Sequence, residues 1–225
     1  VQSQVFAGHV EAVSNNGETF EVGDAVYGQA SSGAFGELVS APASQLAPKP
    51  ASLTFEQAAA IPDSGMTALQ GLRDVGELQA GQHVLVNGAS GGVGTSAVQI
   101  AKARGAEVTA VCSTRNLERV RALGADHVVD YTREDFVRDD VPYDGRYVPC
   151  GGGSGGNWLG PLLAMAKIAI VNRFSSRTMR SFLMQPNTDD LLELGKLVDA
   201  GKFEPVVEHI LPLSDAAEAL RHVAG

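Results

Sequence analysis

The residues with the clearest chemical purpose are the glycines that follow an apolar run. The run His83–Asn87 is typical of a buried strand of a parallel sheet. Four glycines follow within residues 88–94, and residues 95–103 then show helical spacing with good helix formers. Glycine lets backbone N–H groups approach phosphates, and the positive end of a helix dipole favours their charge. The sequence therefore predicts a site for the pyrophosphate of a dinucleotide.

The residues after the second predicted strand, Glu107–Cys112, bear on which dinucleotide binds. In NAD-selective sites a carboxylate about 20 residues beyond the glycines bonds the ribose 2′-hydroxyl. Here Ser113, Thr114 and Arg115 stand instead, and hydroxyl groups beside a guanidinium suit a 2′-phosphate. The alternative is that Ser113 caps the next helix and Arg115 is a solvated surface residue. The missing acid and the present base together favour NADP over NAD.

Tyr131 follows the third predicted strand, His127–Asp130. Parallel strands end at one edge of a sheet, so an aromatic ring here can lie along the adenosine phosphate. A lone aromatic residue at the end of a strand can equally serve packing. Both interpretations of Tyr131 stay open.

Strands and helices alternate from residue 83 onward, which predicts an α/β fold with a parallel, doubly wound sheet. Beyond the elements already named, we expect helices at 116–123 and 132–137, strands at 146–149 and 167–171, an amphipathic helix at 189–200 that ends at Gly201, a strand at 206–211 and a capped helix at 214–223.

Residues 1–61 have the pattern of a small β-barrel, with short strands separated by Pro, Gly, Ser and Asn. The expected strands lie at 10–13, within 21–28 and at 36–40. Thr54 is expected to cap a helix through residue 60, with Gln57 at the capping-box position. A second helical stretch is expected at 66–75.

Composition limits the possible partners. The chain has 225 residues, of which 44% are hydrophobic and 19% charged, as in ordinary globular proteins. Its net charge of -9 argues against a nucleic-acid partner, because phosphates would be repelled. The sequence has no run of about 18 apolar residues that could span a membrane, and no N-terminal signal is evident. We therefore expect a cytoplasmic location.

The stretch Val141–Gly151 has two strand-like pieces with very little between them. A parallel crossover needs about a dozen residues or more, usually a helix. We therefore expect that residues are missing between Asp144 and Gly145, and that the chain also begins late and ends early.

Several motifs in chain order resemble one family. They are Phe20–Gly28, Ala58–Pro62, Gly65–Leu69, Asn87–Gly94, Ala101–Ala106, Leu123–Tyr131, Leu197–Phe203 and Leu213–Ala219. Together they resemble the zinc-independent medium-chain dehydrogenase/reductases, especially the NADPH:quinone oxidoreductase branch. The resemblance implies a GroES-like catalytic barrel beside a Rossmann domain. The implied domains are residues 1–62 (catalytic, N-terminal part), 63–171 (Rossmann) and 172–225 (return to the catalytic domain).

The resemblance also implies a set of cofactor contacts and an activity. The activity would be hydride transfer from NADPH to a small quinone or α,β-unsaturated carbonyl, in a homodimer. An enoyl-thioester reductase and a non-catalytic NADPH-binding protein are the alternatives. The implied cofactor-binding residues are Thr67, Ser90, Gly91, Gly92, Val93, Ser113, Arg115, Tyr131 and Gly151.

Metal and acid–base chemistry have little support in the sequence. Zinc-containing relatives carry Gly-His-Glu where this chain has Ser3-Gln4-Val5, and the only cysteines are Cys112 and Cys150. His9 fits a strand better than a ligand set, and the other histidines are scattered. No tyrosine precedes a lysine by four positions, which excludes the short-chain reductases. We expect no metal, and we assign no catalytic residue.

Overall fold

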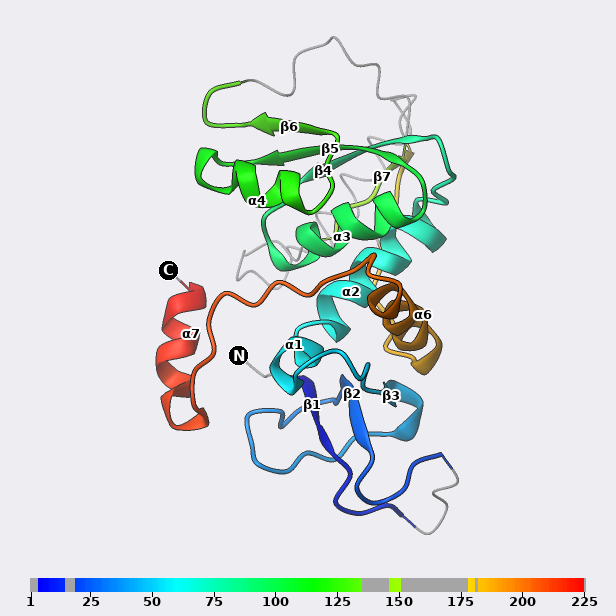
Figure 1. Ribbon diagram of the computed structural model, residues 1–225, viewed down its shortest axis with the longest axis vertical. Coiled ribbons are helices and arrows are strands. Elements are labelled where there is room, and N and C mark those ends of the chain that lie inside the picture. Colours follow the sequence, from blue (N-terminus) through cyan, green and yellow to red (C-terminus); the bar gives the residue numbers. More distant parts are fainter. Residues whose placement is uncertain (1–3, 15–18, 135–145, 151–177, 181, 225) are drawn as a thin grey trace. The chain divides into compact units, whose positions relative to one another are not determined.

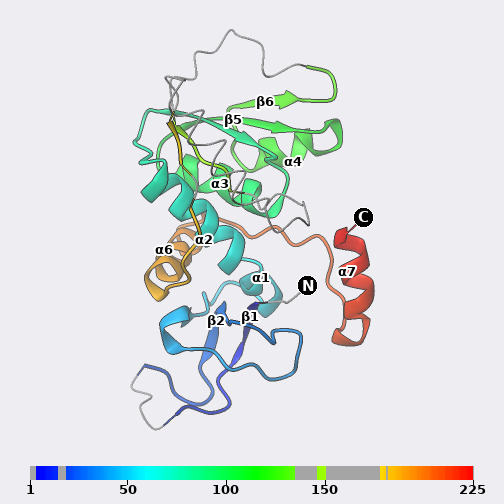
Figure 2. The ribbon, with the colours of Figure 1, turned by 180° about the vertical axis from the view of Figure 1, so that it is seen from behind.

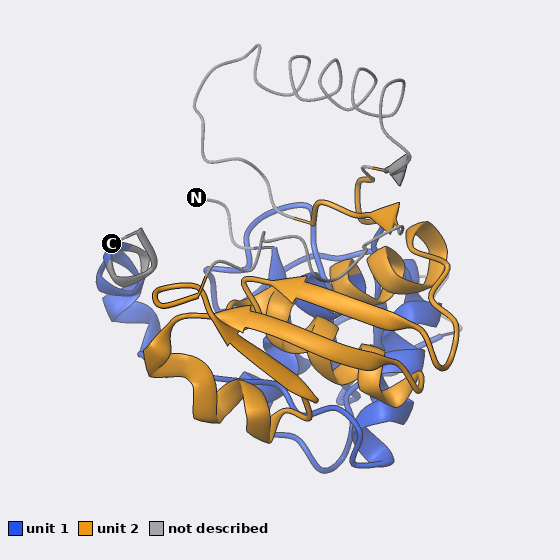
Figure 3. Cartoon of the chain, turned by 90° about the horizontal axis from the view of Figure 1, so that it is seen from above, with its two compact units in different colours: residues 1–66, 185–225 blue, residues 67–184 orange. Residues whose placement is uncertain are grey.

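The chain forms two compact units in the computed structural model, which describes residues 4–14, 19–134, 146–150, 178–180 and 182–224. One unit is built from residues 1–66 and 185–225, and the other from residues 67–184 (Figure 3). The division between Met66 and Thr67 falls within one helix, α2 (Pro62–Gln70).

A parallel sheet lies at the centre of the unit formed by residues 67–184. Its strands are β4 (His83–Asn87), β5 (Glu107–Cys112) and β6 (His127–Asp130), with β5 between the other two. The sequence prediction for these three strands is confirmed. Valines and alanines on β5 are buried, as expected for a central strand that is covered on both faces.

Two helices make the crossovers between these strands. Helix α3 (Gly92–Ala103) connects β4 to β5, and α4 (Leu117–Ala122) connects β5 to β6 after a 3₁₀ turn, η3 (Thr114–Asn116). Both helices lie on the same side of the strands (Figure 1). A shared apolar core joins helices and sheet, and its members include Val98, Ala101, Val108, Ala110 and Val120.

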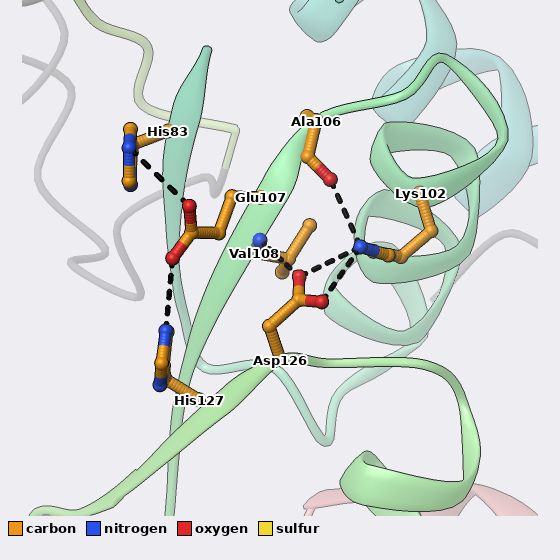
Figure 4. Close-up of polar contacts among 7 residues, drawn as sticks. All are labelled: His83, Lys102, Ala106, Glu107, Val108, Asp126 and His127. Carbon is orange, nitrogen blue, oxygen red and sulfur yellow. Dashed lines mark hydrogen bonds and ion pairs between the residues drawn. The ribbon is translucent and has the colours of Figure 1, made fainter. Parts of the chain in front are cut away.

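An ion pair fastens α3 to the sheet. Lys102 Nζ lies 2.7 Å from Asp126 Oδ2 and donates a second hydrogen bond to the Ala106 carbonyl oxygen at 3.0 Å (Figure 4). The same carboxylate accepts the backbone N–H of Val108 at 2.7 Å. These contacts join the end of α3, the start of β5 and the residue that precedes β6. The hydrogen bond from Lys102 is the main reason that the pKa of Asp126 is lowered.

Two arginines at β7 and β8 pair with the carboxylate of Glu77. Helix α2 runs into a π-helical turn, η2 (Gly71–Val75), and β7 (Arg146–Tyr147) pairs in parallel with β8 (Thr178–Met179). Arg146 and Arg180 lie 2.7 and 2.9 Å from the oxygens of Glu77 and lower its pKa.

The unit formed by residues 1–66 and 185–225 has an antiparallel sheet and short helices. Its strands are β1 (Val5–His9), β2 (Ala25–Gln29) and β3 (Leu46–Pro48), with β2 central. Its helical elements are η1 (Ala43–Gln45), α1 (Phe55–Ala59), α6 (Thr188–Asp199), η4 (Leu213–Asp215) and α7 (Ala216–Ala224) (Figure 2).

Two helix boundaries follow the sequence prediction closely. Thr54 caps α1, and its side chain and that of Gln57 form a reciprocal capping box. Helix α6 is followed by Gly201 at φ +64°, a conformation that favours glycine. The π-helical turn η2 was not expected, although a helical stretch at 66–75 was.

Three predicted strands are wrong, and a predicted helix is not found in the part of it that the structure describes. Residues 10–13 and 36–40 are not strands, and residues 206–211 run without a strand partner among the described residues. Val10 still exchanges backbone hydrogen bonds with Gly23 and Asp24, so the pairing of β1 and β2 extends to it. The start of the helix expected at 132–137 is a turn through residue 134. The expected strand at 167–171 and the junction at Asp144 lie outside the described residues.

Candidate cofactor site

The glycine turn after β4 places an uncapped helix N-terminus at the carboxyl edge of the sheet. Gly88 has φ +71°, and Gly91 is the N-cap of α3 with extended backbone. Gly91 has no side chain that could cap the helix, so the N–H groups of the first turn receive no capping acceptor from the N-cap residue. Gly91 and Gly92 are exposed. The amides at the first turn of α3 and the positive end of its dipole fit the pyrophosphate of a dinucleotide.

Gly94 makes the close approach of α3 to this turn possible. A Cβ atom at this position would lie 2.1 Å from the Gly88 carbonyl oxygen and 2.8 Å from Ala89 Cα. Both are backbone atoms, so no side-chain movement could relieve the overlap. In dinucleotide-binding turns, the third glycine allows the helix to pack closely against the strand. Gly94 fits that position.

The strand register brings the other predicted contacts to the same sheet edge. Asn87 is opposite Val111, and Cys112 is opposite Asp130. The Ala89 N–H also donates to the Val111 carbonyl oxygen at 3.0 Å. The residues that follow β4, β5 and β6 therefore lie along one edge, and these include Ser90–Val93, Ser113, Arg115 and Tyr131.

Ser113 and Arg115 differ in how they are held. The Asn116 Nδ2 donates to Ser113 Oγ at 3.1 Å. Ser113 makes no side-chain cap for η3, so the capping alternative is wrong for that turn. Arg115 is exposed and has no hydrogen bond or ion pair to the described part of the chain. Its guanidinium is therefore available to an anionic ligand.

A buried carboxylate at the end of β6 organises the same region. Asp130 is 4% exposed and accepts hydrogen bonds from the Thr114 hydroxyl at 2.5 Å and the Thr132 hydroxyl at 2.6 Å. These hydroxyl groups are the main reason that its pKa is lowered. Asp130 and Thr132 were not predicted from the sequence as site residues. The only available signal was an acid at the end of the third strand.

The remaining predicted cofactor contacts are less informative. Tyr131 is 55% exposed, and its backbone N–H donates to the Cys112 carbonyl oxygen at 3.2 Å. Thr67 lies half-buried on α2. Gly151 lies outside the described residues. Cys150, just before it, is half-buried, and burial raises the pKa of its thiol.

Three histidines lie in the described strands, and each has identified polar contacts. His9 ends β1, where its ring nitrogen lies 3.0 Å from the Gly23 carbonyl oxygen and its ring meets Phe55 edge-on. His83 on β4 and His127 on β6, the two strands that flank β5, lie 3.3 and 2.9 Å from different carboxylate oxygens of Glu107 (Figure 4). Strand register creates this pairing, which sequence spacing did not predict. In the part of the chain that is described, no group of three or more histidine, cysteine, aspartate or glutamate side chains is arranged to hold a metal ion.

Comparisons with known proteins show which family the chain resembles. Two family models described as zinc-binding dehydrogenase match residues 92–141 and 123–225. Human mitochondrial NAD(P)H oxidoreductase RTN4IP1 is 34% identical over 91% of this chain and 62% of its own length. A chloroplast envelope quinone oxidoreductase homolog from Arabidopsis thaliana is 32% identical over 95% of this chain and 73% of its own length.

A solved structure gives the same result at the level of the fold. Escherichia coli quinone oxidoreductase complexed with NADPH matches 99% of this chain and 78% of its own, with a TM-score of 0.79 and 25% identity. The parallel sheet and the glycine turn define an α/β protein with the type of fold that binds dinucleotides. The chain belongs to the medium-chain dehydrogenase/reductase family and has quinone oxidoreductases among its relatives. It spans 62% of the length of the mitochondrial relative.

Proposed function

We propose that this chain binds NADPH and carries the cofactor half of an oxidoreductase that reduces quinones or α,β-unsaturated carbonyls. One observation carries the proposal. The uncapped N-terminus of α3 lies at the same sheet edge as the exposed Arg115, and no carboxylate directly follows β5. The relatives named above support an oxidoreductase that uses NAD(P)H.

Named residues would hold each part of the cofactor. The amides of Gly92 and Val93 suit the pyrophosphate. Gly91, whose N–H donates to the Gly88 carbonyl oxygen at 3.0 Å, and Ser90 would complete the turn around it. Ser113 and Arg115 suit a 2′-phosphate, which is why we propose NADPH over NADH. Tyr131 would lie along the adenosine, while Thr67 and Gly151 are proposed for the nicotinamide half from family resemblance alone.

For hydride transfer, the protein mainly has to bind and orient the two reactants. When bound, a reduced nicotinamide supplies a hydride to an electron-poor acceptor. The chain's part is to hold the two reactants close together and to exclude water. A quinone or enone can take its proton from water, so a dedicated acid is not required. We therefore propose a reaction without zinc, consistent with Gln4 and Val5 in place of the histidine and glutamate of zinc-containing relatives.

The wider setting of the protein is also proposed. We infer a homodimer and a cytoplasmic location, with residues 1–62 and 172–225 contributing to the catalytic domain and residues 63–171 forming the Rossmann domain. No helix in the described ranges has the length and apolar character needed to cross a membrane.

The proposal is tested first by calorimetry and then by an assay of turnover. NADPH and NADH are first titrated into the folded chain, and we expect tighter binding of NADPH. Loss of nicotinamide absorbance is then followed with quinones, enones and enoyl thioesters as acceptors. No heat with either coenzyme would overturn the proposal. Binding without turnover would instead indicate a non-catalytic role, and a strong preference for thioesters would indicate an enoyl-thioester reductase.

A further inference from the structure

A chain of side-chain hydrogen bonds links two parts of the candidate site that are distant in sequence. Arg119, on α4, donates from Nη2 to the Ser90 carbonyl oxygen at 3.2 Å and to Asn116 Oδ1 at 3.1 Å. The Asn116 Nδ2 then donates to Ser113 Oγ at 3.1 Å. Arg119 and Asn116 are half-buried. The glycine turn and the residue proposed for the 2′-phosphate are therefore connected through two side chains that the sequence analysis did not single out.

The direction of these hydrogen bonds follows from the chemistry of arginine. A guanidinium has only donors, so it must face the amide oxygen of Asn116. The amide nitrogen is then turned toward Ser113, whose oxygen accepts. Ser113 keeps its single proton for a further acceptor. A 2′-phosphate, which near neutral pH carries a charge of about −1.5 to −2, offers such acceptor oxygens.

The adjacent hydroxyl group has the opposite preference. The Thr114 hydroxyl donates to the buried Asp130 at 2.5 Å, so its only proton is already used. Thr114 can therefore accept from a ligand but cannot donate to one. Between these two neighbouring hydroxyl groups, only Ser113 has a proton to offer a phosphate.

We propose that Arg119 is a positioning residue for recognition of a 2′-phosphorylated dinucleotide. It sets the hydrogen-bond direction of Ser113 through Asn116, and it holds the pyrophosphate turn through the Ser90 carbonyl. Binding at the 2′-phosphate and binding at the pyrophosphate are coupled through this one guanidinium. The inference rests on the proposed function, because it requires that a dinucleotide binds at this edge.

A double-mutant cycle in coenzyme affinity tests the inference. Dissociation constants for NADPH and NADH are measured by calorimetry for the unaltered chain, Arg119→Met, Ser113→Ala and the double variant. Each single change should lower the preference for NADPH over NADH about tenfold, which corresponds to about 1.4 kcal/mol. The double variant should have nearly the same preference as either single variant, because both changes remove the same hydrogen bond to the phosphate.

Arg121→Met is the matched control, because Arg121 is on the same helix but is exposed and pairs with Glu118 at 2.7 Å. It should leave both affinities unchanged. Thermal unfolding of every variant checks that the fold is retained. A merely structural role for Arg119 would weaken NADPH and NADH equally and would not change their ratio.

Asn116→Asp tests the same inference without altering Arg119. An ionised aspartate only accepts hydrogen bonds, so it would take the Ser113 proton away from the ligand. The preference for NADPH should fall, and it should fall less when Ser113 is already alanine. An equal fall in both backgrounds, or additive losses in the Arg119 cycle, would overturn the inference while leaving the proposed function intact. Failure of the unaltered chain to bind either coenzyme would overturn the proposed function and with it this inference.

Discussion

Arg115 is the side chain on which the choice of coenzyme most directly depends. It is exposed and free of described partners, so its removal should not disturb the fold. We expect Arg115→Ala to weaken NADPH binding about tenfold or more, since a hydrogen bond to a charged group contributes about 1.5–3 kcal/mol. NADH binding should change little. Calorimetric titration of both coenzymes checks this, and equal losses for both would place Arg115 outside the 2′-phosphate site.

Asp126 has a structural rather than a ligand-binding role. Its carboxylate accepts the N–H of Val108, a fully buried residue, and pairs with Lys102. Asp126→Ala should lower the free energy of unfolding by about 1–3 kcal/mol, because it leaves a buried donor without its acceptor. Asp126→Asn keeps an acceptor oxygen and should cost less. Urea unfolding measures both variants, and equal losses would contradict the role given to the Val108 contact.

The lowered pKa of Asp126 also predicts a pH dependence. The folded state binds the proton more weakly than the unfolded state does, so the stabilisation is present above the ordinary pKa and is lost as the pH falls. Stability should therefore decline below about pH 4, and the decline should be smaller in Asp126→Asn. Glu37→Gln, at an exposed loop position, is the control. An unchanged decline in Asp126→Asn would show that other carboxylates cause it.

The sequence predicted part of this site, and physical reasons explain the rest. Ser113 and Arg115 could be found because they replace an expected acid at a known distance from the glycines. Asn116, Arg119 and Asp130 act through the directions of their side chains after a crossover helix has been packed against the sheet. Residue type and spacing do not determine those directions.

The connection between β4 and α3 depends on one glycine more than on the others. A Cβ at Gly94 would overlap the backbone of Gly88 and Ala89, whereas a Cβ at Gly91 would lie 3.6 Å from Gly88 O, an ordinary contact. Gly94→Ala should therefore force α3 away from the turn and cost about 1–3 kcal/mol or more. Gly91→Ala should fold with nearly unchanged stability. Thermal unfolding compares the two, and equal stability would contradict the packing role of Gly94.

Elements were predictable where burial dictated the sequence pattern. Strands β4, β5 and β6 each contribute apolar residues to one core, among them Val86, Val108 and Val128, so their bounds could be read from the sequence. The strand expected at 206–211 has a similar pattern, but Ile210 is 68% exposed and Leu211 is 43% exposed. A strand also requires a partner, which periodicity along one segment cannot provide.

At the scale of the whole molecule, the ends of the chain return to one unit. Residues 1–66 and 185–225 pack together although the other unit separates them in sequence. The Thr188 hydroxyl donates to the Leu46 carbonyl oxygen at 2.8 Å, which joins the start of α6 to β3. The Tyr27 hydroxyl, on β2, donates to the Leu191 carbonyl oxygen at 2.5 Å. Neither contact could be predicted from local pattern, because each depends on which segments meet after the chain folds.

Tyr27 should make the stability of the unit formed by residues 1–66 and 185–225 sensitive to alkaline pH. The residue is fully buried, and burial, with a smaller contribution from the charge of Asp199, raises its pKa. The unfolded chain ionises Tyr27 near its ordinary pKa of about 10, whereas the folded chain keeps it neutral, so stability is retained below that pH and falls above it. Near neutral pH, Tyr27→Phe should lower the free energy of unfolding by about 1 kcal/mol, which is the contribution of one hydrogen bond.

The same substitution removes the titrating group, so the disadvantage of Tyr27→Phe relative to the unaltered chain should shrink as the pH rises above about 10. Urea unfolding at neutral and alkaline pH measures this difference. Tyr147→Phe is the control, because Tyr147 is 54% exposed and its substitution leaves the buried Tyr27 in place. If the gap between Tyr27→Phe and the unaltered chain stays constant with pH, the alkaline sensitivity does not arise from Tyr27. The hydrogen bond from Tyr27 to the Leu191 carbonyl oxygen would then stabilise the unit without making its stability depend on pH.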